Sequence, residues 1–176
     1  MKMSKSKTFL SVAVALAVIG GTLAGVLVTA CNSQPSISVY VKPTTQEAQP
    51  GQTITASIQI EPGNRGISGV EINLGFNPDI FQAISIESGT FLGNNTLTGL
   101  KELGNESGTI RFASARVGVT TPPSPPGVFA VAKFVVKPTA MAGTYDLTLI
   151  KVRLTNQDFL ELTDIKVEAA KVTITQ

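Results

Sequence analysis

Apolar and polar residues alternate with a period of two through most of the chain after residue 35. The clearest stretch contains Ile54, Ala56, Ile58 and Ile60, which alternate with hydroxyl or amide side chains between residues 53 and 59. Side chains that alternate in this way point to opposite faces of a strand, so that one face is buried and the other is solvated. No part of this region keeps a 3.6-residue period. The pattern therefore predicts strands and no helices.

Turn-forming residues divide this region into about nine or ten short strands. Turns such as Asn77-Pro78-Asp79 separate the apolar stretches. We expect strands at 37–41, 53–60, 70–76, 80–86, 109–116, 128–136, 144–154, 159–162 and 167–175. Strands of this number and length predict an all-β fold, a sandwich of two packed antiparallel sheets.

For three segments the sequence gives a more specific prediction. Residues 89–108 are rich in Gly and Asn and interrupt the strand pattern, and we expect Phe91, Leu92, Leu97 and Leu100 to anchor this segment. Residues 120–127 contain four prolines and are expected as an exposed loop or edge, because proline cannot donate to a central ladder. Residues 128–136 are almost continuously apolar, which predicts a central strand that is covered on both faces or contacts a partner through its outer face.

The first 31 residues have the pattern of an export signal. Lys2, Lys5 and Lys7 precede an apolar run at 9–28, as in secretory signals. The run leads into Val28-Thr29-Ala30-Cys31, which resembles the bacterial lipobox. The resemblance implies that residues 1–31 are a lipoprotein signal segment and that a lipid on Cys31 tethers the protein to the extracellular face of the membrane. A retained transmembrane helix with an incidental cysteine is the alternative.

Residues 32–35 are short and polar, end in proline, and are expected to form a spacer before a single folded domain at 36–176. The formal charge of the whole chain is +2, but three lysines lie in the signal segment and no acidic residue precedes Glu47. Removing those three from the 14 cationic residues leaves 11 against 12 acidic residues, a net charge of −1. This balance argues against nucleic-acid binding, which depends on clustered Lys and Arg.

The composition also excludes most catalytic sites. The chain has no histidine and one cysteine, so it contains neither a Ser/His/Asp nor a Cys/His arrangement, and no disulfide framework or thiolate zinc site can form. A pair of carboxylates could still act in a glycosidase, but no spacing in the sequence indicates one. Asn77, Asp79 and the 156–158 turn do not form a recognisable calcium-ligand series. We therefore predict a protein that is not an enzyme and that has no cofactor and no metal site.

The order of these features resembles the cohesin domain, the module of bacterial cellulosomes that captures dockerin domains and is related in fold to a class of carbohydrate-binding modules. The longest similar stretch is Gly66-Ile67-Ser68-Gly69-Val70-Glu71-Ile72-Asn73-Leu74-Gly75-Phe76-Asn77-Pro78-Asp79, like the family's third strand and the turn that follows it. Segments 108–115, 127–136, 143–145 and 156–158 follow in the family's order. The resemblance covers residues 36–176 and implies a nine-stranded jelly-roll.

The resemblance also implies a binding face made by the third, fifth, sixth and eighth strands of the family. The residues carried over to this face by position are Gly69, Glu71, Asn73, Arg111, Ala113 and Ala115, with Arg116 at the end of the sixth strand. Glu71 stands where cohesins often place an acidic residue. Gly69 stands where many place an asparagine, and Arg116 falls near a frequent acidic position.

Three functions are compatible with such a domain. The first is capture of a protein partner of the dockerin type, in assemblies that act on polysaccharide. The small residues Gly69, Gly75, Ala113 and Ala115 favour this function, because they let another backbone approach closely. The second is direct polysaccharide binding, which usually needs exposed aromatic rings, whereas this chain has no Trp, only two Tyr, and Phe residues mostly at core positions. The third is structural surface adhesion.

Overall fold

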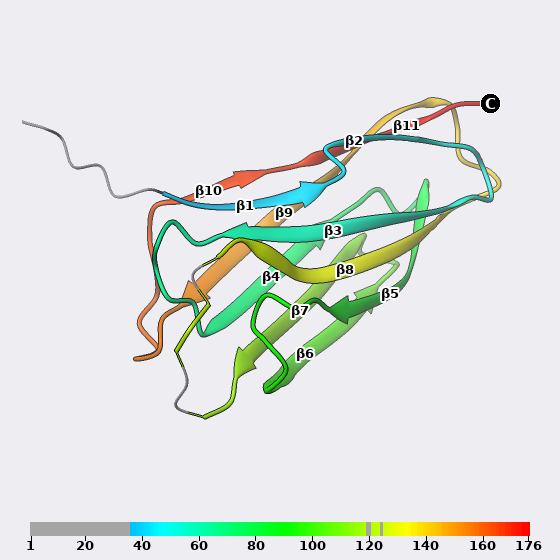
Figure 1. Ribbon diagram of the computed structural model, residues 1–176. Helices are drawn as coiled ribbons and strands as arrows, with labels where there is room; N and C mark the ends of the chain where they lie inside the picture. The colour runs from blue at the N-terminus through cyan, green and yellow to red at the C-terminus, as the bar shows by residue number, and fades with distance from the viewer. Residues whose placement is uncertain (1–35, 119–120, 124) are drawn as a thin grey trace, which may run out of the picture. The chain divides into compact units, whose positions relative to one another are not determined.

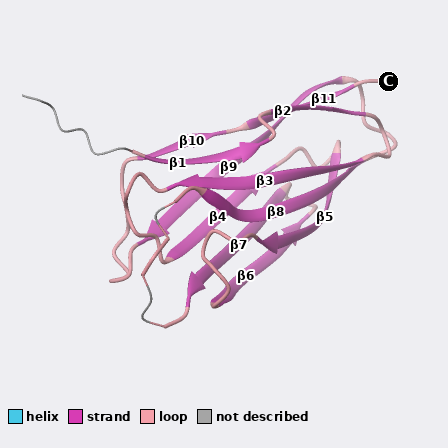
Figure 2. Cartoon of the chain, in the orientation of Figure 1, coloured by secondary structure: helices cyan, strands magenta, loops and turns pink. Residues whose placement is uncertain are grey.

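The computed structural model describes residues 36–118, 121–123 and 125–176, and these residues form two β-sheets packed face to face (Figures 1 and 2). The strands are β1 (Ile37–Lys42), β2 (Thr45–Ala48), β3 (Thr53–Glu61), β4 (Gly69–Gly75), β5 (Phe81–Ser88), β6 (Thr96–Gly104), β7 (Thr109–Arg116), β8 (Gly127–Val136), β9 (Gly143–Thr155), β10 (Ile165–Glu168) and β11 (Ala170–Ile174). No helix that could cross a bilayer occurs in these ranges. The predicted signal segment with Cys31 and the spacer at 32–35 lie outside the described residues.

The two sheets have five and six strands. Their orders are β10-β1-β3-β8-β5 and β2-β11-β9-β4-β7-β6. Neighbouring strands are antiparallel except for two pairs, β1 with β10 and β2 with β11, which are parallel. The prediction of purely antiparallel sheets is wrong at these two pairs. The first and last segments of the domain lie side by side and run in the same direction, and period-two alternation carries no information about strand direction.

Within the described ranges there are eleven strands where the resemblance implied nine, because two segments change sheets. β1 and β2 are separated by Pro43 and Thr44, and β10 and β11 are separated by Ala169. In each case the chain leaves the five-stranded sheet and continues in the six-stranded one. Proline at the first crossing cannot donate to a ladder, which favours a break there. Counting each of these pairs as one segment gives nine.

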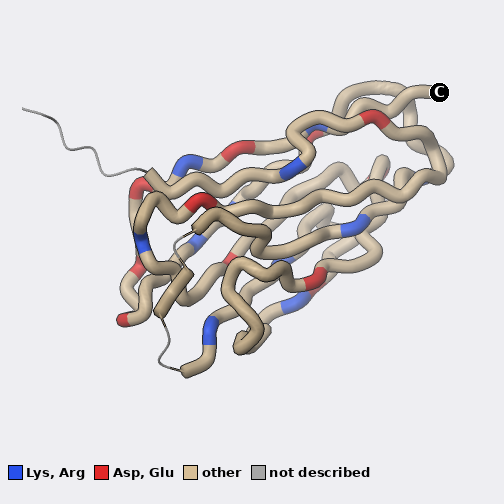
Figure 3. The backbone as a smooth tube through the Cα atoms, viewed as in Figure 1, with Lys and Arg blue, Asp and Glu red and all other residues tan. Residues whose placement is uncertain are grey.

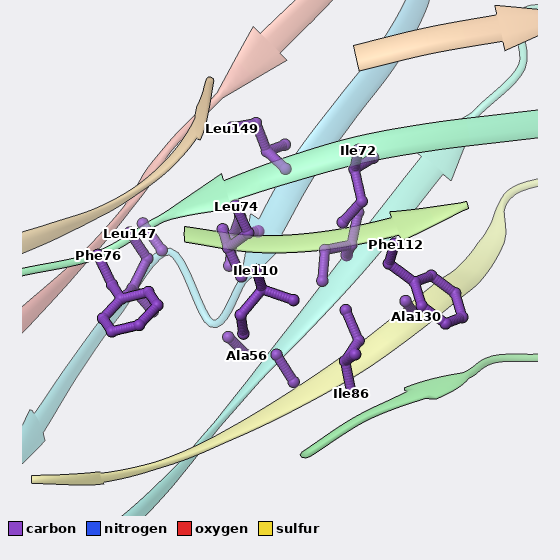
Figure 4. Packing of buried hydrophobic residues seen from close by; sticks show 14 of the residues in the cluster. Ala56, Ile72, Leu74, Phe76, Ile86, Ile110, Phe112, Ala130, Leu147 and Leu149 are labelled. Atoms are coloured by element: carbon purple, nitrogen blue, oxygen red, sulfur yellow. The ribbon is translucent and has the colours of Figure 1, made fainter. Parts of the chain in front are cut away.

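The core lies between the sheets and is built from the apolar positions that the alternation identified (Figure 4). Ile54, Ala56, Ile58 and Ile60 of β3 are all buried. Aromatic rings join the two layers: Phe76, directly after β4, packs edge-on against Phe134 of β8 with ring centroids 5.2 Å apart. Burial of one large apolar side chain contributes about 1.5–3 kcal/mol, so this layer supplies the main stabilisation of a domain without disulfides.

Residues 96–104 form β6 at the edge of the six-stranded sheet, where the sequence pattern did not indicate a strand. A bulge between Thr98 and Leu100 places Gly99 outside the regular pairing with β7, and this interruption hides the strand pattern in the sequence. Phe91 and Leu92 are buried as predicted, whereas Leu97 is 66% exposed and is not an anchor.

Residues 159–162 do not form the predicted strand. The chain makes only an isolated bridge between Thr155 and Glu161. Phe159 has a φ of 59° and is 82% exposed. A left-handed residue interrupts the extended backbone that a strand requires, so the apolar content of this segment serves no strand pairing.

The apolar segment that contains β8 is a central strand, since it pairs with β3 on one side and β5 on the other. Phe134 and Val136 point into the core, while Lys133 is exposed and Val131 is half-buried. The outer face of β8 is therefore open, so of the two predicted alternatives cover on both faces is wrong, and contact with a partner through the outer face stays a prediction.

Candidate functional site

Four neighbouring strands of the six-stranded sheet form an open outer face, in the order β9-β4-β7-β6 (Figure 1). When β1 with β2 and β10 with β11 are each counted as one segment, these strands are the eighth, third, sixth and fifth of nine. They are the four strands that the cohesin resemblance assigned to its binding face. We call the outer surface of these four strands the β9-β4-β7-β6 face.

Six of the seven residues predicted for partner binding lie together on this face. They pair across β4 and β7 as Gly69 with Ala115, Glu71 with Ala113, and Asn73 with Arg111. None of the six is buried, whereas Val70, Ile72 and Phe112 between them point into the core. Alternate residues of the two strands thus point into the core or onto the outer face, as the alternation of apolar and polar residues predicted.

Arg116, the seventh predicted residue, has a different position. It follows Ala115 by one residue, so its side chain leaves β7 on the opposite side of the pleat. Its Nη1 donates to the carbonyl of Leu92 over 2.7 Å, and its Nη2 donates to the carbonyl of Thr121 over 3.1 Å. Arg116 therefore joins two loops at the end of the sandwich, which the sequence did not indicate.

Charged side chains on the face are arranged in local pairs. Glu71 lies near the centre, with Lys151 Nζ 2.6 Å from its Oε1 and Arg153 Nη1 4.0 Å from its Oε2. Arg111 Nη1 lies 3.1 Å from Glu102 Oε2. Figure 3 shows basic and acidic residues interspersed along the strands. The face therefore offers paired charges that can position a partner, not a single-sign field.

Asn73 lies between two of these pairs, because it is opposite Arg111 on β7 and opposite Lys151 on β9. Its Oδ1 is buried and accepts no hydrogen bond from the residues that the structure describes. Both neighbouring cations already contact carboxylates. Asn73 Oδ1 is therefore not presented to an approaching partner, whereas the Arg111 side chain is 47% exposed.

A shallow hollow of about 350 Å³ lies over the middle of the face. Gly69, Ala113 and Ala115 form its floor, and Leu97 and Arg153 stand at its sides. A second hollow of about 490 Å³ also uses Gly69 and Ala115, and it extends to Phe159 in the loop after β9. Small side chains leave this part of the sheet open, so an approaching chain can come close to the backbone.

The loop after β9 is joined to the face by Arg153. Its Nε lies 3.2 Å from Glu161 Oε1, and its Nη2 lies 3.0 Å from Glu161 Oε2. These hydrogen bonds, together with the opposite charge, lower the pKa of Glu161 and raise the pKa of Arg153. Both groups stay charged near neutral pH.

Sequence reasoning missed four residues of this region: Leu97, Lys151, Arg153 and Phe159. The alternation of cationic residues with apolar ones at 151–154 could have placed Lys151 and Arg153 on the outer side of β9. Leu97 and Phe159 lie in segments whose backbone departs from regular strand geometry, so no periodic signal identifies them.

The outer face of the five-stranded sheet has a different chemistry. Tyr40 of β1 donates a hydrogen bond to Glu61 Oε1 over 2.7 Å, and Lys42 Nζ lies 5.2 Å from the centre of its ring. The hydrogen bond to Glu61, burial, and the negative charges of Glu61 and Glu168 raise the pKa of Tyr40 to about 12. This hydroxyl remains protonated at neutral pH and serves as a structural donor.

Metal ligands are not clustered in the described ranges: no group of three His, Cys, Asp or Glu side chains there could hold an ion. Asn77 Oδ1 instead accepts a hydrogen bond from the Asp79 amide, and Asn156 Oδ1 accepts one from the Asp158 amide. Both asparagines thus close turns, as their spacing to the following aspartates favours.

The sequence matches a model of one protein family, described as "Cohesin domain", over residues 39–175. A search of curated proteins finds no match. Solved structures with the same fold include the OlpA cohesin in complex with Doc918 from Clostridium thermocellum, with a TM-score of 0.67 and 17% identity over 80% of this chain and 99% of that one.

Two further structures extend the comparison. The third cohesin of ScaC, in complex with a ScaB dockerin mutated in its C-terminal helix, from Acetivibrio cellulolyticus, has a TM-score of 0.66 and 19% identity over 80% of this chain and 99% of that one. A non-cellulosomal cohesin from the archaeon Archaeoglobus fulgidus has a TM-score of 0.62 and 15% identity over 80% of this chain and 92% of that one.

Proposed function

The chain belongs to the cohesin domain family, and from this membership we propose that its β9-β4-β7-β6 face binds a dockerin module of another protein. Cohesin domains are non-enzymatic protein-binding modules, and this chain is one. Cohesins of similar fold occur in complexes with dockerins in Clostridium thermocellum and Acetivibrio cellulolyticus. The proposed partner is therefore a dockerin-bearing protein.

The observation that carries this proposal is the floor of small residues at the centre of the face. Gly69, Ala113 and Ala115 come from two adjacent strands and line one hollow. Adjacent strands lie about 4.8 Å apart, so three neighbouring strands span about 10 Å, close to the diameter of an α-helix with its side chains. The dockerin in the Acetivibrio complex has such a helix at its C-terminal end. A helix fits on β4, β7 and β6.

The paired charges around this floor would fix how the partner is oriented. Glu71 contacts Lys151 and lies 4.0 Å from Arg153, and its side chain is only 25% exposed. Partly buried ion pairs at an interface select the correct partner and suppress wrong ones more than they add affinity. Glu71 and Arg111 thus set the register of the partner, and the small residues let it approach.

Isothermal titration calorimetry with dockerin modules from the same genome, purified with calcium, tests this proposal. Ala113→Arg places a long charged side chain in the hollow, and we expect it to weaken binding by about 100-fold, equivalent to about 2.8 kcal/mol. Thr55→Arg is the matched control, because Thr55 is exposed on β3 in the other sheet. Absence of binding to every dockerin, or equal loss in both variants, would contradict the proposal.

We also propose that a lipid on Cys31 holds this domain at the extracellular face of the membrane. The support is the cationic start, the apolar run at 9–28 and the lipobox-like Val28-Thr29-Ala30-Cys31. The spacer at 32–35 reaches at most about 14 Å when extended, so the domain would lie close to the bilayer.

Metabolic labelling of the full chain with a palmitate analogue tests the anchor. We expect label and membrane association in the unmodified chain and loss of both in Cys31→Ser. Membrane association without label, unchanged in Cys31→Ser, would instead identify a retained transmembrane helix.

A further inference from the structure

An exposed aromatic side chain stands beside the proposed dockerin face. Phe159 is 82% exposed, whereas the other phenylalanines of the described ranges are buried: Phe76, Phe81, Phe91, Phe112, Phe129 and Phe134. Its φ of 59° lies in the left-handed region, which is unfavourable for a residue with a Cβ. An exposed ring held in a strained conformation is more typical of a contact site than of a connecting loop.

The loop that carries Phe159 is fixed by its own hydrogen bonds. Asn156 Oδ1 accepts from the amides of Asp158 and Leu160 over 2.9 and 3.0 Å. The Phe159 amide donates to the Asn156 carbonyl, and the Asn156 amide donates to the Leu160 carbonyl. One asparagine therefore makes four bonds within five residues. The ring of Phe159 is presented on a preorganised turn, which lowers the entropy cost of binding.

Two further contacts tie this loop to neighbouring elements. The Arg153 guanidinium holds Glu161 through two hydrogen bonds, and the same guanidinium faces Glu71 in the middle of the face. On its far side the loop continues to Thr163, whose carbonyl accepts from Arg65 Nη1 over 2.9 Å. The position of Phe159 is thus coupled to the dockerin face through Arg153.

The two hollows adjoin at Ala115, and we call them together the depression. Gly69, Ala115 and Thr155 line both hollows. Leu97, which is 66% exposed, stands at the β6 end, and Phe159 stands at the opposite end. Gly69, Ala113 and Ala115 make the floor, whereas polar lining residues such as Thr155 and Asp158 stand around it. A polar side chain placed on the floor itself would lose water without gaining many hydrogen bonds. The depression therefore fits a large apolar side chain.

We infer that Phe159 and Leu97 flank a seat for a large apolar side chain projecting from a helix of the dockerin partner, with Phe159 as the main apolar anchor of the interface. This inference rests on the proposed function, because the seat is continuous with the proposed dockerin face. It adds that the loop after β9 is part of the recognition surface and that this chain selects partners by an apolar helix residue. Aromatic side chains, phenylalanine included, are enriched at protein–protein interfaces.

Substitutions at the two ends of the seat test this inference with the same dockerin modules, purified with calcium. We expect Phe159→Ala to weaken binding by about 30-fold and Leu97→Ala by about tenfold. Ile84→Ala is the matched control, because Ile84 is 48% exposed on β5 in the other sheet, and we expect it to change affinity less than twofold. Circular dichroism should show equal melting temperatures, since all three side chains are exposed.

Replacing the exposed apolar helix residues of the dockerin one at a time completes the test. One of these changes should be non-additive with Phe159→Ala, which identifies the side chain in the seat. Normal affinity of Phe159→Ala and Leu97→Ala for a dockerin that binds the unmodified chain would overturn the inference and leave the proposed function intact. Failure of every dockerin to bind would overturn both. A dimer of the chain that Phe159→Ala dissociates, with dockerin affinity unchanged, would assign the seat to a second copy and also overturn the inference.

Discussion

The rings of Phe112 and Phe129 meet between the two sheets with centroids 5.5 Å apart. Phe112 belongs to β7 and Phe129 to β8, and both rings are buried. On β7 the residues on either side of Phe112 are Arg111 and Ala113, which lie on the proposed dockerin face. One short strand therefore supplies both the contact that joins the layers and part of the surface that would bind a partner.

Truncation of Phe112 should strongly destabilise the folded domain. We expect Phe112→Ala to lower the free energy of unfolding by about 3–5 kcal/mol, because it removes buried apolar surface and leaves a cavity between the sheets. Urea denaturation measures this change. Phe159→Ala removes a ring of the same kind from an exposed position and should lower the free energy of unfolding by less than about 0.5 kcal/mol. Similar losses in both variants would mean that the two layers are not held together by this pair.

Arg116 should contribute to the stability of the folded domain and not to recognition of the partner. Its guanidinium donates to the carbonyls of Leu92 and Thr121, and a lysine, which presents a point charge, cannot reproduce that fork. We expect Arg116→Lys to lower the free energy of unfolding by about 1–3 kcal/mol. Arg111→Lys, at an exposed ion pair with Glu102, is the control and should cost less than about 1 kcal/mol. Equal costs would refute the assigned role.

The loop that carries Phe159 should loosen in acid. The folded pKa of Glu161 is lowered by its hydrogen bonds and opposite charge with Arg153, from an ordinary value of 4.5. A lowered folded pKa means that the pair stabilises the loop above pH 4.5 and that this contribution is lost as the pH falls through the folded pKa. The heteronuclear NOE of the Phe159 amide should therefore stay high above pH 4.5 and drop as the pH is lowered below 4.5 and through the folded pKa of Glu161.

Arg153→Gln provides the control for this pH dependence. Without the guanidinium, Glu161 loses both hydrogen bonds and its main opposite charge, and only the weaker attraction of Lys151 still favours its charged form. The loop should therefore already be more mobile at neutral pH than in the unmodified chain and should change less on acidification. A drop of the same size in Arg153→Gln would show that another group controls the loop.

Direct polysaccharide binding should be absent. The ring of Tyr40 has Lys42 Nζ 5.2 Å from its centre, and Tyr145 packs edge-on against Phe81. Neither tyrosine ring offers a free platform of the kind on which a pyranose stacks, and Phe159 is the one exposed phenylalanine of the described ranges, with no second exposed ring beside it there. We expect the domain at 36–176 to remain in the supernatant with insoluble cellulose or chitin. Saturable retention that Tyr40→Ala or Phe159→Ala abolishes would support the carbohydrate-binding alternative.

Most of the fold could be predicted from the sequence because strand alternation directly reports burial. Ile54, Ile58 and Ile60 reach the core as their period-two spacing predicts. The parallel pairing of β1 with β10 could not be predicted, since it joins residues that are more than a hundred positions apart and alternation does not encode direction. β6 was missed because Gly99 interrupts its pattern at a bulge.

The residues of the candidate site also divide into those that could be predicted from the sequence and those that could not. Gly69, Glu71 and Ala113 could be placed on one face because the family resemblance aligned them with strands of known order. Arg116 was assigned to that face although its phase along β7 places it on the other side. Phe159 could not be identified, because its exposure depends on a left-handed backbone that no period reveals.

Titration of the isotopically labelled domain with a dockerin, followed by amide NMR shifts, tests the central claim most directly. Our account predicts that the largest shifts fall on Glu71, Ala113 and Ala115 and spread to Phe159, while Thr55 and Lys133 on the five-stranded sheet stay unchanged. Shifts concentrated at Thr55 and Lys133, with the β9-β4-β7-β6 face unaffected, would contradict it.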